Sequence, residues 1–128
     1  MNWIESKGNG YKVPLTAYYW VHIDTDSAMY EAEDEAWNML EEALKKTGEK
    51  FEIDETVENY IGLGSYSFKI RVDFVIYAVA FDADVAFSRA ETLIDEITLP
   101  NNIDYVGTEQ RKLIEEEEPV YILHGDDV

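Results

Sequence analysis

Residues 18–33, YYWVHIDTDSAMYEAE, and residues 76–91, IYAVAFDADVAFSRAE, align without a gap at an offset of 58. Each segment begins with an apolar run typical of a strand, passes through an Asp-x-Asp, and continues with small residues at helical spacing. Because the same features occur twice in the same order, the sequence predicts a duplicated strand–helix unit. The matched pairs include Tyr19 and Tyr77, Val21 and Val79, Asp24 and Asp82, Asp26 and Asp84, Ala28 and Ala86, and Ala32 and Ala90.

The remaining segments complete a βαββαβ order. Helices are expected over residues 27–46, before Gly48, and over residues 84–97. Strands are expected over residues 15–23, 51–61, 68–81 and 103–113. This order predicts a ferredoxin-like α+β sandwich with a four-stranded antiparallel sheet, two helices on one face, and an extra terminal strand or arm. The predicted division is an N-terminal arm (1–13), a single domain of two βαβ halves (14–113) and an acidic C-terminal tail (114–128).

The repeat also predicts which strand residues face the helices. We expect the shared strand positions to pack against the helices, namely Tyr19, Val21, Ile23, Tyr77, Val79 and Phe81. The opposite face would then carry Tyr18, Trp20, His22, Ile70, Val72, Phe74 and Ile76. A face this apolar must be covered by the terminal segments, by a second copy of the chain or by a partner. Tyr18, Trp20, His22 and Phe74 are therefore predicted to form an interface or a pocket wall.

Composition restricts the partners. The formal net charge of −18 argues against direct binding of nucleic acid, which relies on Lys and Arg, and against an anionic membrane surface. It favours cationic partners or divalent ions. The absence of Cys excludes disulfides, thiolate metal sites and a Cys nucleophile. No apolar run approaches the roughly 20 residues of a membrane span, and the first residues do not resemble a signal peptide, so a cytoplasmic location is expected.

The two Asp-x-Asp motifs have a structural and a chemical interpretation. VHIDTDSA and VAFDADVA resemble the first motif of the haloacid-dehalogenase phosphotransferases. That family also requires a doubly wound parallel sheet, a later Lys and a further acidic pair. The βαββαβ order predicted for this chain departs from such a sheet. We interpret these aspartates as helix caps, which accept from the free N–H groups of a first turn. A metal-dependent enzyme using Asp24 and Asp26 is the chemical alternative; no metal site and no cofactor are predicted.

Two further catalytic or binding patterns are incomplete in the sequence. Tyr18 and Trp20 on a central strand resemble the stacking platform of RNA-recognition modules, but only Lys69 and Arg71 are expected beside them. Catalysis by a serine needs a base and a residue that orients it, and nothing in the sequence nominates them. His22 is expected to be a packed strand residue.

Acidic residues on the first helix are the strongest unusual feature. Eight of residues 24–42 are acidic and none is basic, whereas Arg89 and neutral residues dilute the second helix. Over the ~27 Å that these residues span as a helix, this is about one carboxylate per 3.4 Å, close to the charge density of one DNA strand. A salt-adapted composition is the general alternative, although Glu outnumbers Asp and Lys outnumbers Arg here.

We therefore expect a non-enzymatic protein that docks on a basic protein surface. Its most concrete form is a DNA-mimic inhibitor of a nucleic-acid-directed defence enzyme, of the anti-restriction or anti-CRISPR type. One alternative is a small-ligand-binding or regulatory domain that forms a homodimer through its sheet. The predicted partner-binding residues are Glu31, Asp34, Glu35, Glu41 and Glu42, with Glu115, Glu116, Glu117 and Glu118 second.

Overall fold

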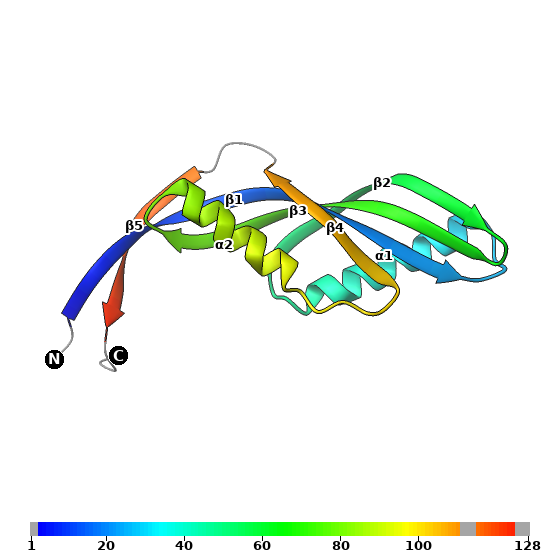
Figure 1. Ribbon diagram of the computed structural model, residues 1–128, viewed down its shortest axis with the longest axis horizontal. Helices are drawn as coiled ribbons and strands as arrows, with labels where there is room; N and C mark the ends of the chain where they lie inside the picture. The colour runs from blue at the N-terminus through cyan, green and yellow to red at the C-terminus, as the bar shows by residue number, and fades with distance from the viewer. Residues whose placement is uncertain (1–2, 111–114, 125–128) are drawn as a thin grey trace.

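The computed structural model describes residues 3–110 and 115–124, and the side chains of residues 10–110. Its elements follow the predicted order with one further strand (Figure 1). They are β1 (Trp3–Asp24), α1 (Met29–Lys45), β2 (Lys50–Gly62), β3 (Ser65–Ala80), α2 (Ala83–Asp95), β4 (Ile103–Gln110) and β5 (Glu115–His124).

The sheet has the ferredoxin-like topology. Its strands lie in the order β2-β3-β1-β4, and all of its pairings are antiparallel, which confirms the predicted fold class. β5 adds to β1 beyond β4 and pairs with it from Lys12 opposite Glu115 to Trp3 opposite His124. Residues 3–13, expected to be an arm, are thus the first half of β1, and residues 115–124 of the expected tail are its partner strand.

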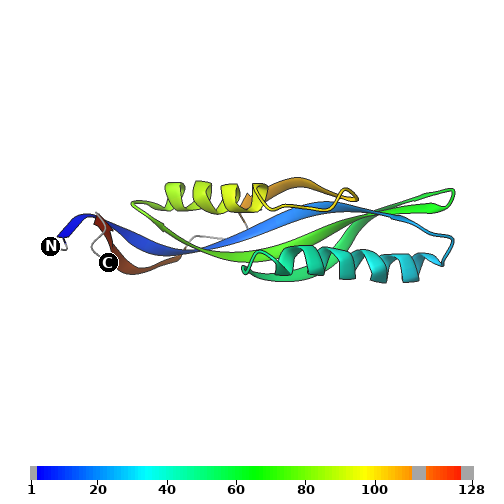
Figure 2. The same cartoon turned by 90° about the horizontal axis from the view of Figure 1, so that it is seen from below.

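Both helices pack against one face of the sheet. Trp37 of α1 donates through Nε1 to Oγ1 of Thr56, 2.9 Å away, and Thr56 is the β2 partner of Ile70. The apolar side of α2 joins the same core cluster, which includes Ile70 and Tyr19. The long strands coil so strongly that this face turns over along the sheet, and Figure 2 therefore shows α2 above it and α1 below. The helices lie end to end along the strands rather than side by side (Figures 1 and 2).

The register of β1 and β3 corrects the predicted facing of β3. Odd-numbered residues of β1 stand opposite even-numbered residues of β3, from Asn9 opposite Ala80 to Tyr19 opposite Ile70 and beyond. Residues opposite one another share a face, whereas the repeat offset of 58 preserves parity and so places matched residues on opposite faces. The predicted outward set of Ile70, Val72, Phe74 and Ile76 is wrong, because all four are fully buried beneath the helices. Tyr77 and Phe81, expected in the core, are 50% and 61% exposed, and Val79, expected beside them, is only partly buried.

The helices repeat at a different offset from the strands. Ala32, Ala36 and Leu40 are buried in α1, and Ala86, Ala90 and Ile94 occupy the same positions in α2, 54 residues later. The difference from 58 is about one helical turn. Two of these four residues arise because residues 25–28 connect β1 to α1, whereas only residues 81–82 connect β3 to α2. The other two arise because β1 and β3 end 56 residues apart, at Asp24 and Ala80.

Only one half of the capping prediction holds. Asp82 is the N-cap of α2 and accepts a 2.9 Å hydrogen bond from the Val85 N–H group. The N-cap of α1 is Ala28, which makes no side-chain cap. Asp24 ends β1 opposite Ser65, so Asp24 and Asp26 precede the helix by too many residues to cap it, and their prediction as caps is wrong.

Candidate functional site

Four acidic residues of α1 line a groove. They lie on the side of the helix that faces away from the core, at the three- and four-residue spacings that share a helix face. The groove has a volume of about 640 Å³ and runs between α1 and the segment before β4. Four of the five predicted acids of α1 come together there: Glu31, Asp34, Glu35 and Glu42 line it, with Asn38, Met39, Ala43, Lys46 and Pro100.

The carboxylates of this groove are poorly neutralised. Lys45 lies 3.9 Å from Glu42 and 3.6 Å from Glu41, in exposed pairs that stabilise a helix by only a few tenths of a kcal/mol. Within residues 10–110, no salt bridge joins Glu31, Asp34 or Glu35 to a cation. The groove therefore presents negative charge to solvent along most of its length.

The other predicted acids lie elsewhere. Glu41 lines a second groove on the opposite flank of α1, beside Trp37, Lys45 and Phe51. Glu115, Glu116, Glu117 and Glu118 fall in β5, at the end of the molecule that carries α2 and far along the sheet from α1 (Figure 1). Their side chains lie outside the described residues. The two predicted acidic segments thus do not form one surface along α1.

The predicted sheet-face interface is divided between two sides of the sheet. Tyr18, Trp20 and His22 lie on the face without helices, as predicted. Phe74 does not join them, because it lies in the core with its ring centroid 6.1 Å from that of Phe51. The prediction of Phe74 as an interface residue is wrong, because Phe74 stands opposite Leu15 and shares its buried face. The open face therefore lacks the apolar wall expected of a small-ligand pocket.

Polar side chains of β3 replace that apolar wall. Asp73 accepts from Thr16 at 2.8 Å and from Nε of Arg71 at 3.3 Å, and it raises the pKa of Arg71. Nζ of Lys69 lies 5.4 Å from the ring centroid of Tyr18. The Tyr18 hydroxyl donates to Glu109 at 3.0 Å, and partial burial together with this bond raises the pKa of Tyr18.

A Ser–His–Asp row crosses three strands of the open face. Nδ1 of His22 lies 2.7 Å from Oγ of Ser67, and Nε2 lies 2.9 Å from Oδ2 of Asp104. An ionised Asp104 only accepts, so it favours the tautomer protonated at Nε2 and leaves Nδ1 to accept from Ser67. This row could not be predicted from the sequence, because 45 and 82 residues separate the bonded partners and only the strand register joins them.

The row has the polar groups of a nucleophilic serine but not its surroundings. Ser67 pairs with His22 on one side and Tyr60 on the other, so neighbouring backbone N–H groups are committed to the sheet and not to an oxyanion. Neither of the two grooves beside α1 contains Ser67, His22 or Asp104. We interpret the row as a cross-strand hydrogen-bond network.

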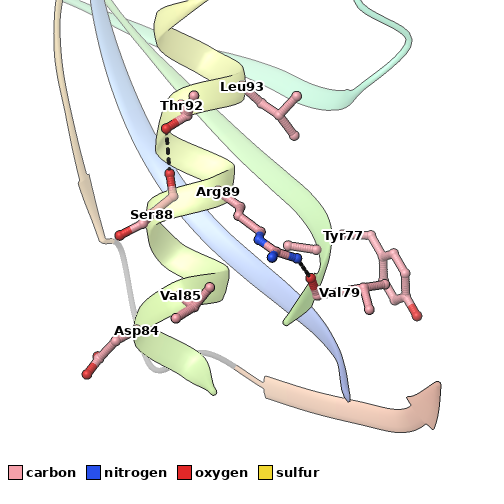
Figure 3. A pocket seen from close by; sticks show the side chains of 9 residues that line it. Tyr77, Val79, Asp84, Val85, Ser88, Arg89, Thr92 and Leu93 are labelled. Atoms are coloured by element: carbon pink, nitrogen blue, oxygen red, sulfur yellow. Dashed lines mark hydrogen bonds between the residues drawn. The ribbon is translucent and has the colours of Figure 1, made fainter. Parts of the chain in front are cut away.

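A third groove lies beside α2 and was not predicted. It has a volume of about 720 Å³ and lies between α2 and the end of β3 (Figure 3). Arg89 reaches across from the helix and donates to the backbone carbonyl of Val79. The lining residues are Tyr77, Ala78, Val79, Asp84, Val85, Ser88, Arg89, Thr92 and Leu93.

The described residues form no cluster suited to a metal ion, and no known family matches the chain. Within the described residues, no three His, Asp or Glu side chains gather closely enough to hold a metal ion, and this includes the surroundings of Asp24 and Asp26. No helix in the same part of the chain is long and apolar enough to cross a membrane. Comparisons with protein-family models, curated proteins and solved structures find no match.

Proposed function

We propose that the protein acts by binding a basic protein surface through the groove lined by Glu31, Asp34, Glu35 and Glu42. The observation that carries this proposal is the convergence of these carboxylates in one groove with few cations beside them. Like charges at this spacing destabilise a helix by a few tenths of a kcal/mol, so fold stability does not account for them. A cationic partner would account for these carboxylates.

The groove suits Lys and Arg side chains in particular. Met39, Ala43 and Pro100 offer apolar contact for the methylene stem of such a side chain, while the carboxylates pair with its charged end. The net charge of −18 would attract a cationic surface over long range and accelerate association at low salt. The sharper form of the proposal is a DNA mimic that occupies the basic cleft of a nucleic-acid-directed defence nuclease.

The test is inhibition of DNA binding by a panel of restriction and CRISPR effector nucleases. We expect the wild-type protein to compete with DNA for at least one nuclease, and competition to weaken steeply as salt is raised. Replacing Glu31, Glu35 and Glu42 together by Lys should weaken competition by roughly 100-fold or more, since each reversal turns an attraction into a repulsion.

A matched variant separates site from net charge. Replacing Glu52, Glu55 and Glu96 by Lys changes the formal charge equally, but none of these residues lines the groove of Glu31, Asp34, Glu35 and Glu42. It should retain most of the competition. Equal losses in the two variants would show that only overall charge matters, and an undiminished Glu31/Glu35/Glu42 variant, folded by circular dichroism, would contradict the proposal.

A further inference from the structure

The end of β3 has a backbone edge without a partner strand. β2 begins at Lys50, opposite Val75, whereas β3 continues for five more residues to Ala80. Its other edge remains paired with β1 as far as Asn9 opposite Ala80. Among the described residues, no strand lies beside residues 76–80 on the β2 side. Such an edge is a template for a further strand.

The hydrogen-bonding groups of this edge can be assigned. The His22 N–H group donates to the Asn102 carbonyl on the β4 side, so the odd-numbered residues of β1 and their even-numbered partners in β3 bond to one another. The Val79 carbonyl therefore points away from β1, and Arg89 donates to it. In an antiparallel strand, the N–H and C=O groups of one residue point to the same side, and the side alternates along the chain. The N–H and C=O groups of Tyr77 and the N–H group of Val79 therefore face outward as well.

An apolar wall stands beside these groups. Val85 and Leu93 of α2 are 37% and 46% exposed and line the groove with Tyr77, which is half exposed. Alternate side chains of an added strand would point toward this wall, as in strand addition to the sheet edges of peptide-binding domains.

We propose that residues 76–80 accept an extended segment of the basic partner as an additional antiparallel strand. This inference rests on the proposed function for the positive charge of the partner. The complementary charge is the net −18 of the chain, with Asp82 and Asp84 exposed at the start of α2. A second copy of the chain would bring another −18 to the same edge, so charge favours a cationic segment over self-pairing.

Arg89 closes the edge when no segment is bound. Its guanidinium occupies the Val79 carbonyl that an incoming N–H group needs, and its charge opposes a cationic segment. Strand addition must therefore displace Arg89. Removal of this side chain should strengthen binding, which is the opposite of the effect expected at a site that uses the arginine as a contact.

The experiment uses the full chain and a blocked peptide of alternating lysine and valine. The control peptide has proline at every valine position, which keeps its charge but removes strand donors and prevents pairing. We expect amide NMR shifts to concentrate at Tyr77, Val79 and Ala80, and the proline peptide to bind at least about tenfold more weakly. Equal affinity for the two peptides, no binding of either, or shifts confined to α1 would overturn the inference.

Two variants locate the pairing. Val79→Pro removes an outward N–H group and no bond to β1, so the variant should still fold. It should bind the valine peptide at least about tenfold more weakly than the wild type does. Arg89→Ala should tighten binding several-fold, and Lys69→Ala, which removes one charge from the open face, measures the part due to charge alone. Two results would contradict strand addition. One is an affinity for the valine peptide that Val79→Pro leaves unchanged. The other is an affinity that Arg89→Ala raises no more than Lys69→Ala does.

The same measurements distinguish this inference from the proposed function. The Glu31/Glu35/Glu42→Lys variant should bind both peptides more weakly but keep its preference for the valine peptide, while it loses nuclease competition. A failed peptide experiment with intact nuclease competition would reject only strand addition. Self-association of the wild type that Val79→Pro abolishes would identify a second copy, not a basic segment, as the occupant of the edge.

Discussion

Tyr19 is the one buried polar side chain whose hydroxyl has no partner among the described residues. It is fully buried in the core, with its ring centroid 5.7 Å from that of Tyr105. Burial raises the pKa of Tyr19 far above the usual range, since the core cannot solvate a phenolate. A hydroxyl removed from water without a new hydrogen bond costs about 1–3 kcal/mol.

Tyr19→Phe should raise the free energy of unfolding by about 1 kcal/mol near neutral pH, because the change removes only the unpaired oxygen. It should also reduce alkaline sensitivity. Tyr19 is neutral in the folded state and ionises near pH 10 when unfolded, so stability is fully present below that pH and falls above it by up to ~1.4 kcal/mol per pH unit. Urea unfolding at neutral and alkaline pH measures both effects. A destabilised variant would reveal a hydrogen bond of Tyr19 in solution.

At the scale of elements, the sequence predicted what single segments determine. Helical spacing identified α1 and α2, and alternation and turn residues identified the strands, because each pattern lies within one element. The facing of β3 depends on its register with β1, in which one residue of slip exchanges the two faces. Phe74 was therefore placed on the wrong side, and the row of Ser67, His22 and Asp104 was not foreseen.

The unequal connections to the two helices predict unequal roles for matched aspartates. Asp82→Ala should lower the free energy of unfolding by about 1 kcal/mol, since it removes the bond to the Val85 N–H group. Asp24→Ala should change it by less than ~0.5 kcal/mol, since α1 begins at Met29 with Ala28 as its N-cap. Chemical denaturation of the two variants makes the comparison. Equal losses would mean that Asp24 caps α1 after all.

At the scale of the whole molecule, negative charge acts against the fold, whereas in the proposed function it favours binding. The groove beside α1 depends on how the segment before β4 packs, but the acidic side of the helix that lines it could be predicted, because its carboxylates lie within one helix. The edge of β3 could not, because it depends on where β2 begins relative to β3. Long-range repulsion among the acids opposes the compact state, and salt screens it.

Sodium chloride should therefore raise the urea midpoint of the isolated protein while it weakens binding to a basic partner. The screening length falls from ~10 Å at 0.1 M salt to ~3 Å at 1 M. At the higher concentration, salt therefore screens the repulsion between most surface carboxylates. The Glu31/Glu35/Glu42→Lys variant has a formal charge of −12, since each reversal adds two to −18, and it should gain less stability from salt. An identical salt response of the two proteins would exclude repulsion as the cause.

The central position of β1 bears on the order in which the sheet can assemble. β1 pairs with β3, β4 and β5, and its outermost contact joins Trp3 to His124. During synthesis the partner β3 emerges before β4, and β5 emerges last. Among these strands β1 therefore waits longest for its last neighbour, and the contact between Trp3 and His124 closes a loop that contains all the elements between them. Long-range closures of this kind slow folding. Until then, part of β1 has an exposed edge, and an exposed edge of this kind favours aggregation of the nascent chain.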